Sequence, residues 1–436
     1  MKYKHALLPA ALASLGFFLS AACGTGGGGS GGAAPVEYPE ASHGRSALEF
    51  FRGEGLSIGI NLGNTLDAFV NWQEPFVASE TAWGNPPASR EVFEWQRAQG
   101  FEVARVPVTW MGHVGPGPGY EISAARMERV AEVVGFARDA GLKVIINMHH
   151  DGQTYSDVER GWLSISRALA SPGERQRITA RFESMWVQIA ERFRDYGDWL
   201  MFQGFNELHV GDWGSGTALQ YEVVNEWNRV FTSAVRRTGG GNADRFLVYS
   251  GYNTSFRTAE AYRSGWFRLP EDPVPGPGRQ IVNFHFYQPN DFALFPRTHQ
   301  WPGAGAAGSA EFVDGVFRGF REEFVDRGIP VIIGEIGPAR YANHSNRPNH
   351  PFDPANEPAA RESRLRYVAH VYRSARENGL VPVFWENGGR FNPQTAGEGD
   401  FSLIDRAAAG PNSPESAEVV RAMVEAVRGA SPPWGD

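Results

Sequence analysis

Four segments of this chain repeat the same junction, in which an amphipathic stretch ends at a glycine and an apolar run follows at once. The junctions are centred on Gly100, Gly141, Gly328 and Gly379. Glycine adopts the left-handed conformation that closes a helix more easily than other residues do. Short apolar runs that follow such a stop are typical of buried strands. The repetition therefore predicts that helices and strands alternate over most of the chain.

Eight strands are predicted, and helical patterns separate most of them. The predicted ranges are 56–62, 101–107, 143–149, 199–206, 245–250, 281–287, 330–335 and 381–386. This alternation implies an α/β fold, a (β/α)8 TIM barrel that forms a single catalytic domain over residues 45–430. Barrels of this class reach the length that 436 residues require. An open, doubly wound sheet is the alternative, but no glycine-rich phosphate loop follows the first predicted strand.

Two glutamates lie at the ends of predicted strands. Glu207 follows the run 200–206, and Glu335 follows the run 329–334. In a barrel of parallel strands, the carboxyl ends of the strands carry the active site. Both carboxyl groups are therefore expected at one mouth of the barrel. Paired carboxyls at such a mouth are what glycoside hydrolysis requires.

Alternation along the strands places further polar side chains beside these glutamates. With a period of two residues, the pairs that share a face are Val103 with Arg105, Asn147 with His149, His285 with Tyr287, Ile333 with Glu335, and Val383 with Trp385. If these faces point inward, polar and aromatic groups converge at the rim. Barrel interiors are normally filled with Val, Ile and Leu, so such a set indicates a functional site.

Eight short motifs follow one another along the chain. They are GINLGNTLDA from Gly59, ETAWGNP from Glu80, RVPVTW from Arg105, INMHHD from Ile146, FNE from Phe205, HFYQPNDF from His285, GEIG from Gly334 and FWENG from Phe384. In this order they resemble glycoside hydrolase family 5, the cellulase-like barrels. Within the family the chain is most similar to subfamily 4, which contains endo-β-1,4-glucanases and xyloglucanases.

The resemblance implies a role for each matching position. It implies that Glu207 is the acid/base and Glu335 the nucleophile of a retaining glycoside hydrolase. It implies that catalysis is supported by Arg105, His149, Asn206, His285 and Tyr287, and that Trp385 is the platform under the reacting sugar. Two positions depart from the family pattern. Leu208 stands where the family usually has proline, and Gln203 stands where the subfamily usually has glutamate.

Further substrate contacts are predicted in the first-strand and rim segments. Aromatic faces stack on the apolar surfaces of sugar rings, and polar neighbours bind the hydroxyls. The candidates are Asn64, Asp67, Trp83, His150, Trp162, Trp213 and Trp301. Capping of a local turn is an alternative role for Asp67.

The two carboxyl groups are expected to do different work. A carboxylate at Glu335 beside the Arg105 cation should stay ionised and attack the anomeric carbon. Glu207 needs a raised pKa in order to protonate the leaving oxygen. Retention requires about 5–5.5 Å between the carboxyl groups, and this is the predicted separation. The expected substrates are β-1,4-glucan backbones: cellulose-like chains, mixed-linkage glucan or xyloglucan. A β-mannanase or other β-glycanase is one alternative, and a non-catalytic, surface-tethered glycan-binding lipoprotein is an alternative of another class.

No cofactor and no metal ion are expected. His149 and His150 are consecutive on a predicted strand, so their side chains should face opposite ways and not share an ion. The formal net charge of −8, without any basic block, argues against nucleic acid as a partner. A polysaccharide is the expected partner, and a monomer is the expected state.

The N-terminal residues are similar to an export signal. Lys2 and Lys4 precede an apolar stretch at 6–19, and small residues lead to Cys23, the single cysteine of the chain. Residues 1–22 are expected to be a signal peptide, and 23–44 a flexible Gly/Ser-rich tether that carries lipid on Cys23. This predicts an outer-membrane or cell-surface lipoprotein, whose only membrane contact is its lipid. An ordinary secreted or periplasmic enzyme, cut near Ala22, is the alternative. Residues 431–436 are expected to form a C-terminal tail.

Overall fold

The computed structural model of this protein describes most of the chain. The described residues are 44–70, 76–152, 154–155, 158–159, 161–303, 308–341, 352–388 and 399–435. The predicted signal peptide, Cys23 and the predicted tether up to residue 43 lie outside them. All described residues belong to one compact unit, Tyr38–Asp436.

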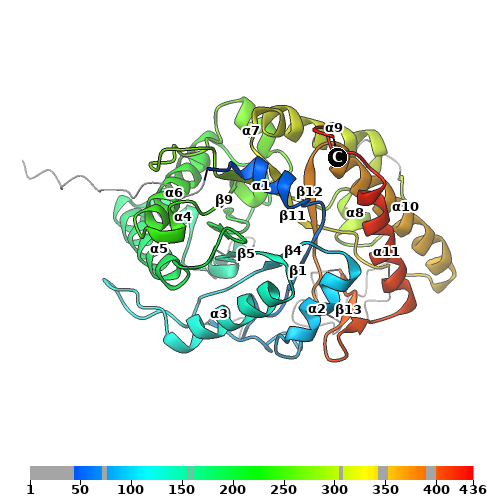
Figure 1. Cartoon of the computed structure of the whole chain (residues 1–436), viewed down its shortest axis with the longest axis horizontal. Helices are drawn as coiled ribbons and strands as arrows, with labels where there is room; N and C mark the ends of the chain where they lie inside the picture. Colours follow the sequence, from blue (N-terminus) through cyan, green and yellow to red (C-terminus); the bar gives the residue numbers. More distant parts are fainter. Residues whose placement is uncertain are drawn as a thin grey trace, which may run out of the picture. The chain divides into compact units, whose positions relative to one another are not determined.

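Parallel strands close into a barrel at the centre of this unit (Figure 1). Within the described ranges its eight strands, in spatial order, are β1 (Gly59–Asn61), β12 (Leu380–Phe384), β11 (Val331–Ile336), β10 (Gln280–Phe286), β9 (Leu247–Ser250), β8 (Leu200–Gln203), β5 (Lys143–Asn147) and β4 (Val103–Val106). The pairing of β1 with both β12 and β4 closes the ring. Each predicted strand range overlaps one of these strands, so the prediction of a (β/α)8 barrel is confirmed and the open sheet is wrong.

Helices surround the barrel, as Figure 1 shows. They are α2 (Arg90–Gln99), α3 (Ala124–Asp139), α4 (Ile165–Ala170), α5 (Pro172–Arg192), α6 (Ala218–Arg236), α7 (Thr258–Arg263), α8 (Asn290–Ala293), α9 (Ala310–Glu323), α10 (Glu357–Glu377) and α11 (Pro414–Arg428). Gly100 ends α2 with φ of 104°, in the left-handed conformation that the junction pattern predicts. In the described ranges, every helix is too short or too polar to cross a membrane.

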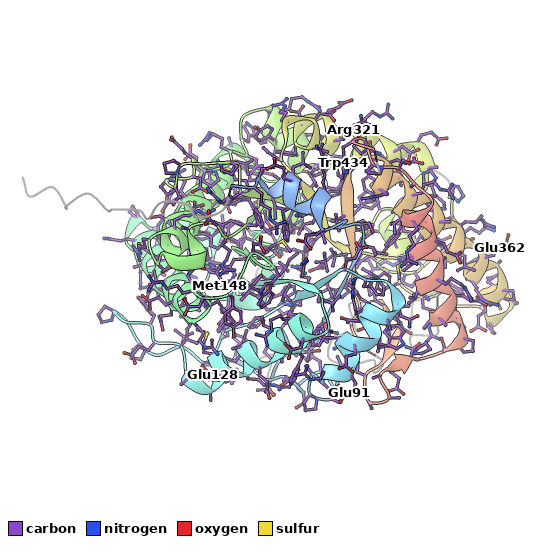
Figure 2. All side chains as sticks on the ribbon, viewed as in Figure 1. Glu91, Glu128, Met148, Arg321, Glu362 and Trp434 are labelled. Carbon is purple, nitrogen blue, oxygen red and sulfur yellow. The ribbon has the colours of Figure 1, made fainter. Side chains whose placement is uncertain are left out.

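Two apolar layers hold the barrel together. The outer layer packs the strands against the surrounding helices. The inner layer fills the amino-terminal half of the barrel, where α1 (Ala47–Gly53) contributes Phe50 and Phe51 to a cluster with Val103, Ile145 and Ile332. Helix α1 therefore covers the end of the barrel opposite the carboxyl ends of the strands. In Figure 2 the buried Met148 lies in the middle of the view, whereas Glu128 and Glu362 lie at its edge.

A β-bulge interrupts β11 at Gly334. Phe284 on β10 pairs with Ile333, and the next residue, His285, pairs with Glu335, so Gly334 has no partner in the register. Ile332 lies in the inner cluster and Ile333 in the outer layer. The prediction that Ile333 and Glu335 share a face is therefore wrong, because the extra residue of the bulge turns Glu335 back toward the barrel interior.

Small two-stranded sheets follow three of the barrel strands. They are β2 (Phe69–Val70) with β3 (Val77–Ala78) after β1, β6 (Thr154–Tyr155) with β7 (Val158–Glu159) after β5, and β13 (Ile404–Asp405) with β14 (Gly410–Pro411) after β12. Because they begin where these barrel strands end, they belong to the loops at the carboxyl end of the barrel. This is the end at which both predicted glutamates lie.

Candidate active site

Glu207 and Glu335 meet at the carboxyl end of the barrel. Glu207 follows β8 and Glu335 lies in β11, yet a carboxylate oxygen of one lies within 4.8 Å of a carboxylate oxygen of the other. Both line a pocket of about 510 Å³. The other predicted residues that line this pocket are His149, His150, Asn206, Trp213, His285, Tyr287 and Trp385.

The carboxylate of Glu335 accepts hydrogen bonds from two sides. The guanidinium of Arg105 donates to Oε1 at 2.9 Å, and the hydroxyl of Tyr287 donates to Oε2 at 3.0 Å. Burial raises the pKa of Glu335, and the charge of Glu207 acts in the same direction, whereas His285 and Arg105 oppose the shift. Both donors bind the ionised form, so they stabilise a negative charge on this buried carboxyl group.

Glu207 is surrounded differently. Its Oε1 lies 2.6 Å from Nδ1 of His285, and 23% of its side chain is exposed. Partial burial among the pocket side chains raises the pKa of Glu207 to about 7, although Arg105 and His150 act against this shift. The carboxyl group is therefore poised to hold a proton near neutral pH and to release it.

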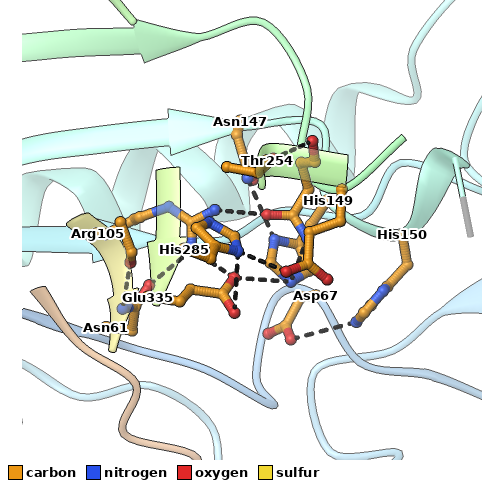
Figure 3. Close-up of polar contacts among 12 residues, drawn as sticks. Asn61, Asp67, Arg105, Asn147, His149, His150, Thr254, His285 and Glu335 are labelled. Carbon is orange, nitrogen blue, oxygen red and sulfur yellow. Dashed lines mark hydrogen bonds and ion pairs between the residues drawn. The ribbon is translucent and has the colours of Figure 1, made fainter. Parts of the chain in front are cut away.

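The two histidines between these carboxyls are neutral at that pH. Burial lowers the pKa of His285 to about 3 and lowers the pKa of His149 well below its usual value. The amide of Asn147 lies 3.2 Å from Nδ1 of His149, and Nε2 of the same ring lies 3.9 Å from Glu335. Arg105, which is fully buried, therefore supplies the fixed positive charge of the cluster (Figure 3).

Trp385 forms one wall of the pocket, parallel to His149. The two rings stack with an interplanar angle of 3° and centroids 5.7 Å apart. Gly63 of the loop after β1 lies against the indole, because a Cβ atom there would come within 2.8 Å of the Trp385 ring. Glu386, the next residue, is held by a buried ion pair in which Nε of Arg406 donates to it at 3.0 Å.

His149 and His150 do not point apart as predicted. Their ring centroids are 4.4 Å apart, and each histidine offers a nitrogen within 4.8 Å of an oxygen of Asp67. The alternation of a strand no longer applies here, because β5 ends at Asn147 and a 3-10 turn begins at His150. The three residues have the donor types of a metal site. However, the two carboxylate oxygens of Asp67 already accept the backbone N–H groups of Asn64 and Thr65.

Several predicted sugar contacts lie behind the pocket wall. Asn64 and Asp67 are buried and do not line the pocket, and Asp67 caps the local turn, which was the alternative role. Trp83 is buried, donates to the carbonyl of Phe69 and packs 5.4 Å from the ring of His150. These positions support the pocket from behind, and the prediction that they contact the sugar needs correction.

Trp301 and Trp162 are also parts of the core. Trp301 is 3% exposed and packs on Tyr367 of α10, with ring centroids 5.2 Å apart. The prediction that Trp301 contacts the substrate needs correction, because its ring is buried against a helix and does not line the pocket. Trp162 donates to the buried Asp151 at 2.7 Å. Trp213, by contrast, lines the pocket and is 50% exposed.

Sequence reasoning missed a group of pocket residues on three segments. They are Asn253, Thr254, Ser255 and Phe256 after β9, Gln288, Asn290, Leu294 and Phe295 after β10, and Phe401 after β12. The hydroxyl of Thr254 donates to the backbone carbonyl of Asn206 at 2.9 Å and so helps to place the residue before Glu207. For the loop after β9, its position after a strand was the only signal, since its residues carry no period, whereas Gln288 and Asn290 lie in the motif that begins at His285. Asn61, beneath the pocket, was not predicted either; its side-chain oxygen accepts a hydrogen bond from Arg105 at 2.9 Å.

A family model and an individual relative both match this chain, and they indicate the same family. The family model described as cellulase (glycosyl hydrolase family 5) matches residues 67–390. Endoglucanase A of Paenibacillus barcinonensis is 31% identical over 368 residues, which cover 80% of this chain and 84% of that protein. The residues that the family model matches include both glutamates and every barrel strand except β1.

Solved structures agree with this comparison. A broad-specificity endoglucanase of subfamily 4 from Bacteroides salanitronis has 36% identity and a TM-score of 0.74, covering 91% of this chain and 99% of that one. A xyloglucanase from Bacteroides ovatus, solved with a XXXG heptasaccharide, has 30% identity and a TM-score of 0.74, covering 90% of this chain and 79% of that one.

Proposed function

The chain belongs to glycosyl hydrolase family 5, and we propose that it cleaves β-1,4-glucan backbones internally by a retaining double displacement. The observation that carries the proposal is the meeting of Glu207 and Glu335, with oxygens within 4.8 Å, inside a pocket that has an aromatic wall. Oxygens this close favour a retaining pair, whose carboxyl groups work about 5–5.5 Å apart, over an inverting pair, which needs about 6.5–9.5 Å.

In the first step, Glu335 attacks the anomeric carbon as the bond to the leaving oxygen breaks. Glu207 gives its proton to that oxygen, and an ester joins the sugar to Glu335. In the second step, water attacks the same carbon while the carboxylate of Glu207 takes its proton, and Glu335 leaves as a carboxylate. Glu207 is thus protonated again at the end of the cycle.

The hydrogen bonds explain why the proton resides on Glu207. Two carboxylates this close repel each other, so the state in which one of the two carboxyl groups carries a proton is favoured. Glu335 accepts from a guanidinium and a hydroxyl, whereas the described contact of Glu207 is to the neutral ring of His285. The negative charge is therefore more stable on Glu335, which gives the pair its two roles.

Two variants test these roles. Glu335→Ala should abolish turnover, and retained activity would remove Glu335 as the nucleophile. Glu207→Ala should recover part of its activity with azide and yield a glycosyl azide of retained configuration, because azide enters where Glu207 had activated water. An inverted azide product would show that Glu207 is not the acid/base.

Soluble β-glucans are the favoured substrates. The relatives include a broad-specificity endoglucanase and a xyloglucanase, which favours mixed-linkage glucan and xyloglucan. A β-mannanase is the second candidate, because recognition of the sugar 2-hydroxyl depends on loops around the pocket. Reducing ends released from mixed-linkage glucan, xyloglucan, carboxymethyl-cellulose and mannan distinguish these possibilities. Release from mannan alone would contradict the glucanase proposal.

The place of action is a separate proposal that depends on the N-terminal sequence. The apolar stretch at 6–19, the small residues before Cys23 and the Gly/Ser-rich segment after it support export and lipid attachment. A tethered enzyme of this kind acts at the outer membrane or cell surface, and without the lipid it is secreted or periplasmic.

A further inference from the structure

Arg105 lies beneath the pocket and donates hydrogen bonds in four directions. Its acceptors are Oε1 of Gln203 at 2.9 Å, Oδ1 of Asn61 at 2.9 Å, Oδ1 of Asn206 at 2.7 Å and Oε1 of Glu335 at 2.9 Å. Among these described contacts three acceptors are neutral amides, and one is a carboxylate. The three amides thus fix the orientation of the guanidinium, and Glu335 is the one anion among its described acceptors.

The orientation of these amides is determined by the backbone around them. Gln203 turns its nitrogen away from Arg105, where it donates to the carbonyl of Phe205 at 2.9 Å and to the hydroxyl of Ser250 at 3.3 Å. Asn61 does the same, with its nitrogen donating to the carbonyls of Gly334 at 2.9 Å and Phe384 at 3.0 Å. A carboxylate at either position would set an oxygen against a backbone carbonyl.

We propose that Gln203 is a positioning residue whose neutral amide orients Arg105 without competing for its charge, so that this charge stabilises the carboxylate of Glu335. The proposal rests on the proposed function, in which Glu335 is the nucleophile. A carboxylate at position 203 would share the cation, because both anions would lie on one buried guanidinium in a medium of low dielectric.

Other charged and titratable groups also face Glu335, and they limit what the test can measure. Glu207, after β8, repels a negative charge on Glu335, and Tyr287, after β10, donates to it. His149 and His285 lie 3.9 Å and 3.5 Å from its oxygens, and burial keeps both rings neutral. Glu207 ionises in the same pH range in which the ionisation of Glu335 is to be measured. The measured reaction must therefore not need Glu207 as a proton donor.

The experiment uses the full chain and a 2,4-dinitrophenyl 2-deoxy-2-fluoro-cellobioside. This leaving group departs without a proton, so the rate of covalent labelling reports the ionised nucleophile alone. The labelling rate is measured against pH for the wild type, Gln203→Glu and Gln203→Met, and peptide mass spectrometry locates the label. Asn283→Asp is the matched control, because it also buries a carboxyl in the barrel, but its amide contacts Ser250 and Gly334 rather than Arg105.

In Gln203→Glu, the fall of the labelling rate at low pH (the acid limb of the profile) should move to higher pH by about one unit. The reason is that the new carboxylate shares the positive charge of Arg105 with Glu335. Gln203→Met should lower the rate at every pH and leave the limb in place, because it removes an acceptor but adds no charge. Asn283→Asp should move the limb less than Gln203→Glu does. An unmoved limb in Gln203→Glu, or an equal shift in Gln203→Met, overturns the proposal.

Two further results keep the test decisive. If Gln203→Glu does not fold, Asn206→Asp takes its place, because the amide nitrogen of Asn206 faces His149 rather than a backbone carbonyl. The same upward shift is expected, and its absence overturns the proposal. If wild-type protein carries no label at Glu335, the proposed function itself fails. That result is distinct from a labelled wild type whose limb Gln203→Glu leaves in place.

Discussion

At the scale of the residue, the two glutamates are chemically identical but have different neighbours. Glu335 has a guanidinium and a phenol as donors, and Glu207 has a neutral imidazole. The two carboxyls and their neighbours come from four strands or the loops that follow them, and one of these strands, β10, supplies both His285 and, just after its end, Tyr287. An acid and a nucleophile therefore arise from one residue type by placement alone.

The acid should control the alkaline side of the pH profile. The pKa of Glu207 is raised to about 7, and the protonated form is the active one. We therefore expect kcat/KM on soluble mixed-linkage glucan to fall as the pH rises through about 7. A 2,4-dinitrophenyl cellobioside, which needs no acid, should show a weaker fall. An identical alkaline limb for both substrates would contradict this assignment.

At the scale of the element, glycines set both the helix ends and the direction of the nucleophile. Gly334 forms the bulge that turns Glu335 inward, and it lies so close to Asn283 that a Cβ atom would come within 2.3 Å of that side chain. Gly328 and Gly379 end the segments before β11 and β12 with φ of 83° and 73°. Glycine is therefore required here for two different reasons: close packing at the bulge, and a positive φ at the ends of the segments before β11 and β12.

These two terminal glycines offer a matched test of strain against packing. A Cβ atom at Gly328 meets no atom within 4 Å, whereas one at Gly379 lies 2.5 Å from the ring of Trp434. Gly328→Ala should lower the free energy of unfolding by about 1 kcal/mol through its positive φ alone. Gly379→Ala should lower the free energy of unfolding by about 1–3 kcal/mol more than this, because its Cβ atom also clashes with the ring of Trp434. Equal losses in urea denaturation would contradict this, and kcat of Gly328→Ala should match the wild type.

At the scale of the whole molecule, the first and last barrel strands are joined twice. They pair directly in the barrel, and their loops are tied together at the rim. Arg406 binds both Glu386 and Thr65, and the amide of Asn85 donates to the carbonyls of Asn64 and Asn387 at 2.9 Å and 3.0 Å. These contacts hold the Trp385 wall in place across the closure of the barrel.

The proposed lipid anchor concerns the whole protein in its cell and can be tested there. Wild-type protein produced in a bacterium that processes lipoproteins should partition into the detergent phase of a Triton X-114 separation. Cys23→Ser should move it to the aqueous phase, because the acyl chains would have no thiol to attach to. The same activity should remain per molecule, since Cys23 precedes the catalytic unit in the sequence. Wild-type protein found in the aqueous phase would support the secreted alternative.

Periodic patterns in the sequence were sufficient to predict the barrel. Within the described ranges, apolar runs after helix-ending glycines located four of its eight strands, and apolar runs between helical patterns located the others. The strand-end positions of Glu207 and Glu335 predicted a shared mouth. These features depend on local periodicity and backbone conformation, which neighbouring residues set. They could therefore be found without knowledge of any long-range contact.

Only the tertiary structure decided which side chains reach the pocket. It turned Glu335 inward through a bulge, brought His149 beside His150, and placed Trp301 in the core against α10. It also gave Glu207 its contact with His285. These outcomes depend on contacts between segments far apart in the chain, and on loops without a repeating pattern, so the period of the sequence carries no information about them.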